Sequence, residues 1–479
     1  MAPGSARPGD TPRGATRGLY QVVVAVSLGA LLAPLNSTML AVALPGLRDD
    51  FDVSAAAVGW LVAGYLIAMA VVQPVGGRLG DELGRRRVYR VALIAFLAAS
   101  LAAAAAPTFF ALVVFRTVQA ISGAVLIPNG MGMLRATVPP EHFGRYAGLN
   151  GAIIGGSAAT GPLLGGAILA VGPWPLLFLA NLPVVLVALV LSRGLPADSP
   201  AAGARTGTGW TGLALFALLL VSLTALLNQL RSDDAPLVLV ATTVGLGAGF
   251  AWSQRTSRSP AAAWPLFKNR SFLGASSHIL LMNLAMYTTL LAIPFFVTDI
   301  QGHDAAVAGV LISGMAALQA LSAPIVGRLS DAVGRRLPAL AGSCLAVLAS
   351  AALIVFIDGD VPVVAIAIPV ALLGLGVGLG FVAASAAAVE AVPVAFAGSA
   401  AGTQSMMRYV GSIIGSAVLA GLLTTGEGSA AGIGTFRVLF ALILVASLLS
   451  IAAAAAIRPR TAIHEAADAI HPTAVPVIR

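Results

Sequence analysis

The stretch that decides the fold is Gly77-Arg78-Leu79-Gly80-Asp81-Glu82-Leu83-Gly84-Arg85-Arg86-Arg87, which joins two long apolar runs. A near-copy, Gly327-Arg328-Leu329-Ser330-Asp331-Ala332-Val333-Gly334-Arg335-Arg336, joins two more, and seven of its ten positions match. Glycine permits tight turns and close helix approach, arginine favours the cytoplasmic side of a membrane, and aspartate can cap a helix or pair with arginine. Topology alone would explain the arginines but not the repeated order Gly, Asp, Gly, Arg, Arg. The repeat therefore predicts two related halves, each with one such loop.

The composition of the chain is that of an integral membrane protein. Of its 479 residues 58% are hydrophobic and 10% charged, and the mean hydropathy is +0.95, whereas a soluble domain has about 25% charged residues. The pI of about 10.5 does not indicate nucleic-acid binding, because the arginines alternate with apolar runs of membrane-spanning length. The single cysteine, Cys344, lies in an apolar run and excludes a disulfide within the chain, and we expect it to be buried.

The apolar runs predict an all-α membrane protein with fourteen spanning helices in a six-plus-two-plus-six order. Residues 1–18 are expected to be a disordered cytoplasmic tail, 19–192 an N-terminal six-helix bundle, 193–271 a linker with two inserted spans, 272–457 a C-terminal six-helix bundle, and 458–479 a second cytoplasmic tail. The predicted spans are about 19–44, 57–76, 88–106, 109–133, 144–170, 174–192, 210–230, 236–253, 272–298, 305–327, 338–357, 362–389, 398–424 and 435–457.

The distribution of arginine and lysine supports the even number of spans. With both termini in the cytoplasm, 22 of the 27 basic residues fall in predicted cytoplasmic segments, as the positive-inside rule requires. The exceptions are Arg48, Arg231 and Arg437 on the outer side and Arg116 and Arg408 inside spans. The arginine distribution indicates an even number of spans more directly than it indicates the number fourteen.

Several motifs resemble those of the major facilitator superfamily, specifically its fourteen-helix drug:proton antiporter branch, and the resemblance covers nearly the whole chain. Leu35 to Pro45 is similar to the first-helix signature, and Trp60, Tyr65 and Pro74 stand where the second helix of the family has them. The opening stretch resembles the family's loop motif, and Arg116 to Ala124 resembles its fourth-helix motif, with Ala120 in place of a usual glycine. The fifth-helix antiporter motif is matched by Gly148, Ser157, Gly161, Pro162, Gly165 and Gly166, with Ser157 in place of a glycine.

The resemblance implies a secondary transporter that works by alternating access, in which the two loops act as conformational switches. It assigns this role to Gly77, Asp81, Gly84, Arg85, Arg86, Gly327, Asp331, Gly334, Arg335 and Arg336. Asp81 and Arg85 are expected to pair with neighbouring helix ends and to latch one state. The fifth-helix glycines let a neighbouring helix approach closely, and Pro162 favours a bend. Ordinary glycine packing between membrane helices is the alternative interpretation of the fifth-helix pattern.

Arg116 is the most informative single residue, because a charge inside a span costs roughly 2.5–3.5 kcal/mol on insertion scales. It is expected to face the central cavity or a partner, and the resemblance places it near the groups that handle substrate and proton. The candidates for coupling are Arg116, Gln119, Asn36, Glu390 and His278; an arginine satisfied by Gln119 and backbone carbonyls is the structural alternative. Candidates for lining the substrate cavity are Thr38, Tyr65, Asn150, Asn283, Tyr287 and Met407.

The chain departs from the family at Asn36, where an aspartate is usual. Because asparagine cannot titrate, the usual coupling group is missing, and Arg116 and Arg408 are the clear intramembrane charges. Glu390 is more simply explained as a surface carboxylate, and His278, although an imidazole titrates near pH 6.5, as a structural hydrogen-bonding group. We expect a neutral to positive cavity and a neutral or weakly acidic amphiphilic substrate. Asn36→Asp should then improve the handling of cations.

The sequence therefore favours an exporter of small amphiphilic organic compounds, such as drugs or antibiotics, driven by proton entry. The alternatives are a facilitator or uptake carrier for a specific metabolite without proton coupling, and a non-transporting membrane sensor. No P-loop and no cluster with metal-ligand spacing is present, so we expect no enzyme activity, no cofactor and no metal. The expected partners are a small molecule, protons and the lipid bilayer, without nucleic acid and with the chain as a monomer. The expected location is the cell membrane of a bacterium, one of high genomic GC content because Lys268 is the only lysine.

Overall fold

The computed structural model describes residues 13–138, 140–195, 210–229, 237–256, 264–358, 360–392, 397–423 and 432–458. Within these ranges the regular structure is helical, and no strand is present. The helices of the first half are α1 (Arg13–Ala41), α2 (Leu44–Asp50), α3 (Ala55–Leu83), α4 (Arg85–Ala104), α5 (Phe109–Thr137), α6 (Pro140–Val171), α7 (Pro175–Leu179), α8 (Asn181–Leu191) and η1 (Ser192–Gly194). Two helices follow, α9 (Trp210–Asn228) and α10 (Leu237–Thr256), and then the short η2 (Trp264–Lys268). The second half consists of α11 (Arg270–Phe295), η3 (Phe296–Ile300), α12 (Ala305–Val333), α13 (Arg336–Phe356), α14 (Val363–Glu390), α15 (Ala397–Leu423) and α16 (Ile433–Ala455).

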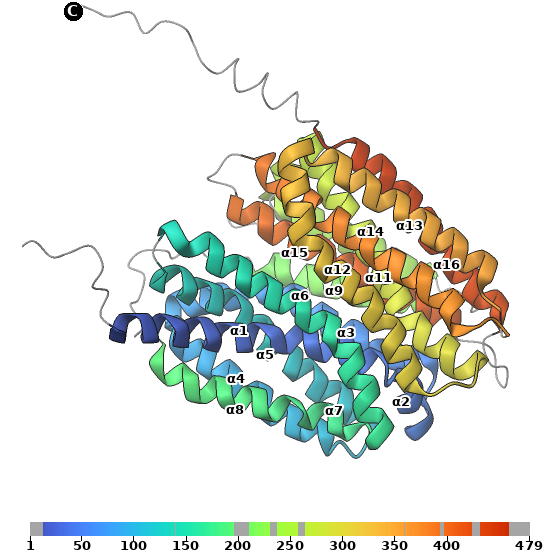
Figure 1. Cartoon of the computed structure of the whole chain (residues 1–479), viewed down its shortest axis with the longest axis horizontal. Coiled ribbons are helices and arrows are strands. Elements are labelled where there is room, and N and C mark those ends of the chain that lie inside the picture. Colours follow the sequence, from blue (N-terminus) through green and yellow to red (C-terminus); the bar gives the residue numbers. More distant parts are fainter. Residues whose placement is uncertain are drawn as a thin grey trace, which may run out of the picture.

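The predicted fold class is confirmed. Thirteen helical segments of the described chain are long and apolar enough to cross a membrane, and the shorter apolar part of α6, Gly156–Val171, completes a set of fourteen. The N-terminal half, α1 to α8, and the C-terminal half, α11 to α16, form two bundles that lie side by side (Figure 1). The helix α9 packs against both α3 and α15, and α10 packs on α9. The inserted pair therefore lies against the seam between the two halves.

The two repeated stretches are mostly helical rather than looped, which corrects the predicted ends of the second and eighth of the twelve bundle spans. The helix α3 continues to Leu83 and α12 to Val333, because neither stretch contains a proline that would stop it. Each helix ends at a glycine with positive φ, 96° at Gly84 and 84° at Gly334, a conformation that residues with a side chain rarely adopt. The next helix begins within two residues, so each connection is a sharp reversal.

Short elements and some boundaries differ from the prediction. The helix α1 begins at Arg13 rather than after residue 18, and the two inserted helices and the last helix match their predicted spans to within about three residues. The short α2 was not predicted, because its seven residues are too few for a periodic signal; Pro45 at its first turn favours helix entry. Asn181, whose side chain bonds back to carbonyl groups one turn earlier, follows a break between α7 and α8. The parts of the predicted tails at 1–12 and 459–479 and of the predicted linker at 196–209 lie outside the described residues.

Cys344 is exposed on α13, contrary to the expectation that it is buried. A thiol is apolar enough to face lipid, so an apolar run does not distinguish a lipid-facing position from a core position.

The two ends of the molecule can be distinguished by their contacts. We call the end that carries Gly84 and Gly334 the loop end, and the opposite end, where α1 ends and α3 begins, the far end. The two halves meet at the far end, where the backbones of α6 and α12 touch: a Cβ atom on Gly166 would lie 3.1 Å from the Cα atom of Ala306. Gly59 of α3 and Ala420 of α15 make a second close contact there. The connection between the halves is therefore tightest at one end.

Candidate substrate cavity

A cavity of about 500 Å³ lies between the two halves, on the loop-end side of these contacts. It is lined by α1, α3, α5 and α6 of the first half and by α11, α12, α14 and α15 of the second. Most of the lining is apolar, with three methionines, Met69, Met286 and Met315, whose flexible side chains adapt to different shapes. The volume is within the range of about 300–1,000 Å³ typical of small-molecule sites.

Polar groups enter the cavity from both halves. The first half contributes Ser37, Thr38 and Tyr65, and the second contributes Asn283, Tyr287, Gln319, Arg408, Tyr409 and Ser412. The Ser37 and Tyr287 hydroxyl groups lie 3.5 Å apart and form a hydrogen bond between the halves. The cavity thus offers hydroxyl, amide and guanidinium groups on an apolar surface, the composition expected of a site that binds an amphiphilic molecule.

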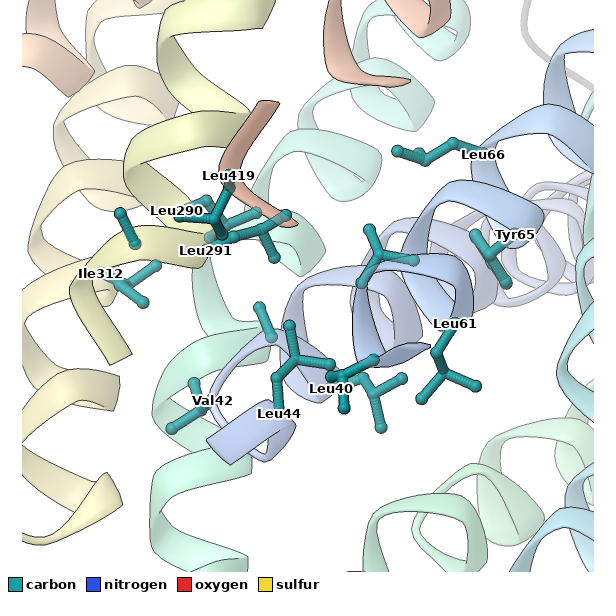
Figure 2. Close-up of a cluster of buried hydrophobic side chains, with 14 of the residues drawn as sticks. Leu40, Val42, Leu44, Leu61, Tyr65, Leu66, Leu290, Leu291, Ile312 and Leu419 are labelled. Carbon is teal, nitrogen blue, oxygen red and sulfur yellow. The ribbon is translucent and has the colours of Figure 1, made fainter. Parts of the chain in front are cut away.

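At the far end, buried apolar side chains close the space between the halves. Figure 2 shows Val42 and Leu44 of the first half near Leu290, Leu291 and Ile312 of the second, all within one buried cluster. All of these side chains are apolar and buried, and we call them the hydrophobic plug.

An ion pair joins the two halves at the same end as the plug. Arg48 of α2 donates from Nη1 to Asp299 Oδ2 at 2.6 Å and from Nη2 to Asp299 Oδ1 at 3.3 Å, so the pair is bidentate and joins the two halves. The guanidinium also lies over the Phe295 ring, 5.6 Å from its centroid. The side chains of Arg48 and Asp299 are 27% and 16% exposed, so water screens the pair less than it screens a surface pair. The cavity is therefore sealed at the far end and extends toward the loop end.

Arg116 is buried beside the cavity rather than in its lining. Its Nη1 donates to Gln119 Oε1 at 2.7 Å, its Nη2 donates to the Asn36 carbonyl at 3.2 Å, and its guanidinium lies 4.1 Å from the centroid of the Tyr65 ring. Gln119 in turn donates to Ser100 at 2.8 Å. Arg116 therefore joins α1, α3 and α5 through neutral groups, and the Tyr65 ring separates it from the cavity.

The other predicted cavity and coupling residues divide into two groups. Thr38, Tyr65, Asn283 and Tyr287 lie in the lining, whereas Asn150 and Met407 are not among the lining residues. Asn150 accepts a hydrogen bond from Ser27 instead, because an amide buried between α1 and α6 finds a hydroxyl partner before it reaches the cavity.

Three of the predicted coupling residues, Asn36, His278 and Glu390, lie far from one another. Asn36 is buried with its Nδ2 atom unpartnered among the described residues, next to the lining residue Ser37. His278 lies in the core of the second half, where its Nδ1 contacts the Ser450 carbonyl and the Ser343 hydroxyl, both at 3.4 Å. Glu390 ends α14 and forms a 2.7 Å ion pair with Arg335. The structure does not bring these three groups together.

At the loop end, the two copies of the repeated stretch have different surroundings. Asp81 pairs with Arg85 within the turn, and the Arg85 guanidinium also lies against Gly132 of α5, whereas Arg335 pairs with Glu390 of α14. Gly77 lies against Pro128 of α5, but a Cβ atom on Gly327 would meet nothing within 4 Å. Arg86 reaches the carbonyl of Arg193 at 2.8 Å. Arg336 is the first residue of α13. The side-chain surroundings of Asp331, and those of Gly148 in the fifth-span motif, are outside the described part of the chain.

The fifth-span motif packs on both halves. Cβ atoms on Gly161 and Gly165 would collide with the α1 backbone at Leu35 and Met39, whereas Gly166 faces α12. Pro162 lies inside α6, and its carbonyl approaches Gly309. Ser157 donates to the Ile154 carbonyl at 2.7 Å, so its hydroxyl group is satisfied within α6 itself. The motif therefore provides the surface on which α6 crosses α1 and α12.

Four polar residues of the lining were not predicted from the sequence, namely Ser37, Gln319, Tyr409 and Ser412. Gln319 is flanked by apolar residues, whereas Ser37, Tyr409 and Ser412 lie in spans with other polar residues close by in sequence. The usable signal for Gln319 is an amide inside a span, which is costly unless it faces a cavity or a partner.

Two helical bundles around a central cavity that is closed at one end define the class of polytopic membrane transporters. The sequence profile of the Major Facilitator Superfamily matches residues 26–269 and 275–476, and the chain belongs to this family. It is a membrane transporter and not an enzyme.

Known relatives extend over most of the chain. It is 30% identical over 440 residues to the uncharacterized MFS-type transporter YvkA of Bacillus subtilis, covering 90% of this chain and 95% of that protein. It is 28% identical over 423 residues to the tetracenomycin C resistance and export protein of Streptomyces glaucescens, covering 87% and 78%. The fold is similar to that of a bacterial homologue of the human lysosomal transporter Spinster in an inward-facing, unoccupied conformation, with a TM-score of 0.66, 15% identity and coverage of 94% and 98%.

Proposed function

We propose that the protein exports small amphiphilic organic compounds by alternating access, in exchange for protons. The observation that carries the proposal is the cavity of about 500 Å³ between the two halves, sealed at the far end by the plug and by the Arg48–Asp299 pair. The arginines near Gly84 and Gly334 favour a cytoplasmic loop end. In this orientation the cavity receives its substrate from the cytoplasm or the inner leaflet, as an exporter requires. The resistance and export protein among the relatives supports the direction of transport.

Transport then requires the halves to rock about the cavity. Gly166 lies close to backbone atoms of Ala306 and Gly309, so no large side chain separates α6 from α12 where they cross. The two helices can pivot at this crossing. Opening of the far end breaks the Arg48–Asp299 pair and separates the plug, and the loop ends close in return. The protein belongs, on this proposal, to the drug:proton antiporter branch of its family and functions in the cell membrane of a bacterium as a monomer with both termini in the cytoplasm.

A second candidate function is facilitated transport without proton coupling. One observation favours it: the described lining contains no carboxylate, and Asn36 stands where the resemblance expects an aspartate. A carrier of this kind would move its substrate along the substrate's own gradient.

Substrate-triggered proton movement separates the two candidates. In inside-out vesicles with an acidic lumen, three fluorescent probes with the same anthracene ring are added in turn: anthracene-9-carboxamide, anthracene-9-carboxylate and the somewhat larger anthracen-9-ylmethyl trimethylammonium. Antiport predicts that a transported probe raises the luminal pH at a rate above that of protein-free vesicles. Probe accumulation without any change in luminal pH would replace antiport by facilitation.

The variant Asn36→Asp extends this assay. It supplies a carboxylate beside the cavity, which attracts a cation and can exchange a proton. We expect it to raise uptake of the trimethylammonium probe at least ~5-fold, the effect of about 1 kcal/mol of favourable interaction. Asn36→Ala is the matched control, because it removes the amide without adding a charge. Equal cation uptake by both variants would contradict this role for position 36.

A further inference from the structure

Arg408 is the only charged side chain among the described residues that line the cavity. It lies in α15, where its guanidinium is 5.0 Å from the centroid of the Tyr409 ring. It is also close enough to Tyr287 to act electrostatically on that residue's hydroxyl group. Three cavity elements, Arg408, Tyr287 and Tyr409, therefore form one group on the wall contributed by the second half.

No carboxylate in the described structure neutralises this guanidinium. The described aspartates and glutamates lie at helix ends or in connections. Several of them are already paired: Asp299 with Arg48, Glu390 with Arg335, and Asp81 with Arg85. Among the described residues the recorded neighbours of the Arg408 guanidinium are neutral tyrosines, Tyr409 and Tyr287.

A second positive charge increases the potential in the cavity. Arg116 lies directly behind the Tyr65 ring, and its hydrogen-bond acceptors, Gln119 and the Asn36 carbonyl, are both neutral. Two guanidinium groups thus flank the cavity without a described counter-charge. In a site of low dielectric constant, charges act more strongly than in water, so this potential attracts anions and repels cations.

We propose that Arg408 is the subsite for the acidic group of the substrate, and that the substrate is an amphiphile that bears a carboxylate. A guanidinium binds a carboxylate through two parallel hydrogen bonds, and the Tyr287 hydroxyl, bonded to Ser37 of the other half, can add a third donor. The apolar wall formed by Met69, Met286, Met315 and Phe381 receives the hydrocarbon part. The inference rests on the proposed export function and specifies its substrate.

The arrangement also gives Arg408 a role in selecting substrates. A neutral amide of similar shape keeps the apolar contacts but offers the guanidinium one uncharged acceptor oxygen in place of the two oxygens of a carboxylate. A cationic analogue places like charges together in a poorly solvated site. The order of affinity is therefore carboxylate, then neutral amide, then cation.

Binding of the three anthracene probes to the purified protein tests the subsite. We expect the carboxylate to bind at least ~10-fold more tightly than the carboxamide, the effect of one charge-assisted hydrogen-bond pair. Arg408→Gln should weaken carboxylate binding by a similar factor and carboxamide binding less than ~3-fold, whereas Arg408→Lys, which retains the charge, should lose less carboxylate affinity than Arg408→Gln. Arg270→Gln is the matched control, because Arg270 is exposed at the start of α11 and outside the cavity.

Two results would overturn the subsite: equal affinity of the wild-type protein for carboxylate and carboxamide, or equal weakening of both by Arg408→Gln. The vesicle assay distinguishes this failure from failure of the proposed function. Uptake of the carboxylate that is unaffected by Arg408→Gln would leave export standing and remove the subsite. No uptake of any probe by wild-type vesicles would contradict both.

Discussion

Replacing Gly309 with alanine is expected to reduce probe uptake into inside-out vesicles by at least ~10-fold, because a backbone shift at the pivot costs about 1–3 kcal/mol. A Cβ atom at this position would lie 2.6 Å from the Pro162 carbonyl and 3.2 Å from the Gly166 Cα atom. Both contacts are with backbone, which cannot move aside as a flexible side chain can. The helices α6 and α12 must therefore separate at the point where the two halves pivot.

The same helix offers a matched control. A Cβ atom on Gly314 would meet nothing within 4 Å, so Gly314→Ala adds the same methyl group and the same gain in helix propensity without a collision. Its uptake rate should remain within ~2-fold of wild type, since surface-like substitutions change free energies by at most about 0.5 kcal/mol. Equal effects of the two substitutions would show that the crossing is not a tight pivot.

Replacing Arg116 with methionine is expected to abolish most transport while raising the melting temperature of the purified protein. Arg116 is 2% exposed and has only neutral acceptors, so its burial carries a desolvation penalty of several kcal/mol that no carboxylate offsets. Methionine has a similar length and removes this penalty. In the variant Gln119 Oε1 loses the hydrogen bond from Arg116, which costs about 1–3 kcal/mol. This cost is smaller than the desolvation penalty that is removed, so the net change in the free energy of unfolding is favourable.

Transport should fall at least ~10-fold in the same variant, because Arg116 fixes the Tyr65 ring in the cavity wall and the Asn36 carbonyl of α1, and small displacements in a binding site cost about this factor. A scan of thermal unfolding and the uptake assay measure the two effects. Arg116→Lys serves as the control that retains the charge. A lower melting temperature together with wild-type uptake would mean that Arg116 is a structural residue only.

The architecture was predictable from the sequence because its signals are long. Fourteen apolar runs, the repeated stretch at Gly77 and Gly327 and the arginine distribution each involve many residues, and a membrane permits few alternatives to helices. The break at Gly84 was indicated as a turn, but the continuation of α3 to Leu83 was not, because polar residues in a terminal helical turn look like a loop.

The site was predictable only in part, because it depends on which face of each helix turns inward. Tyr65 and Asn283 line the cavity and Asn150 does not, although all three are polar residues in apolar spans. Contacts between residues far apart in the chain decide the difference: Asn150 is satisfied by Ser27. The pairing of Arg48 with Asp299, 251 positions apart, is likewise visible only once the halves are in place.

The measurement that tests the account most directly is a pair of spin-label distances between the halves, one at each end. Labels replace the exposed Asp50 and Asp304 at the far end and Glu82 and Val333 at the loop end, in a chain whose one cysteine, Cys344, has been changed to alanine. In Asp299→Asn, which breaks the pair with Arg48, we predict a longer far-end distance and a shorter loop-end distance than in the parent chain. Distances that remain unchanged, or that lengthen at both ends, would contradict alternating access about the cavity.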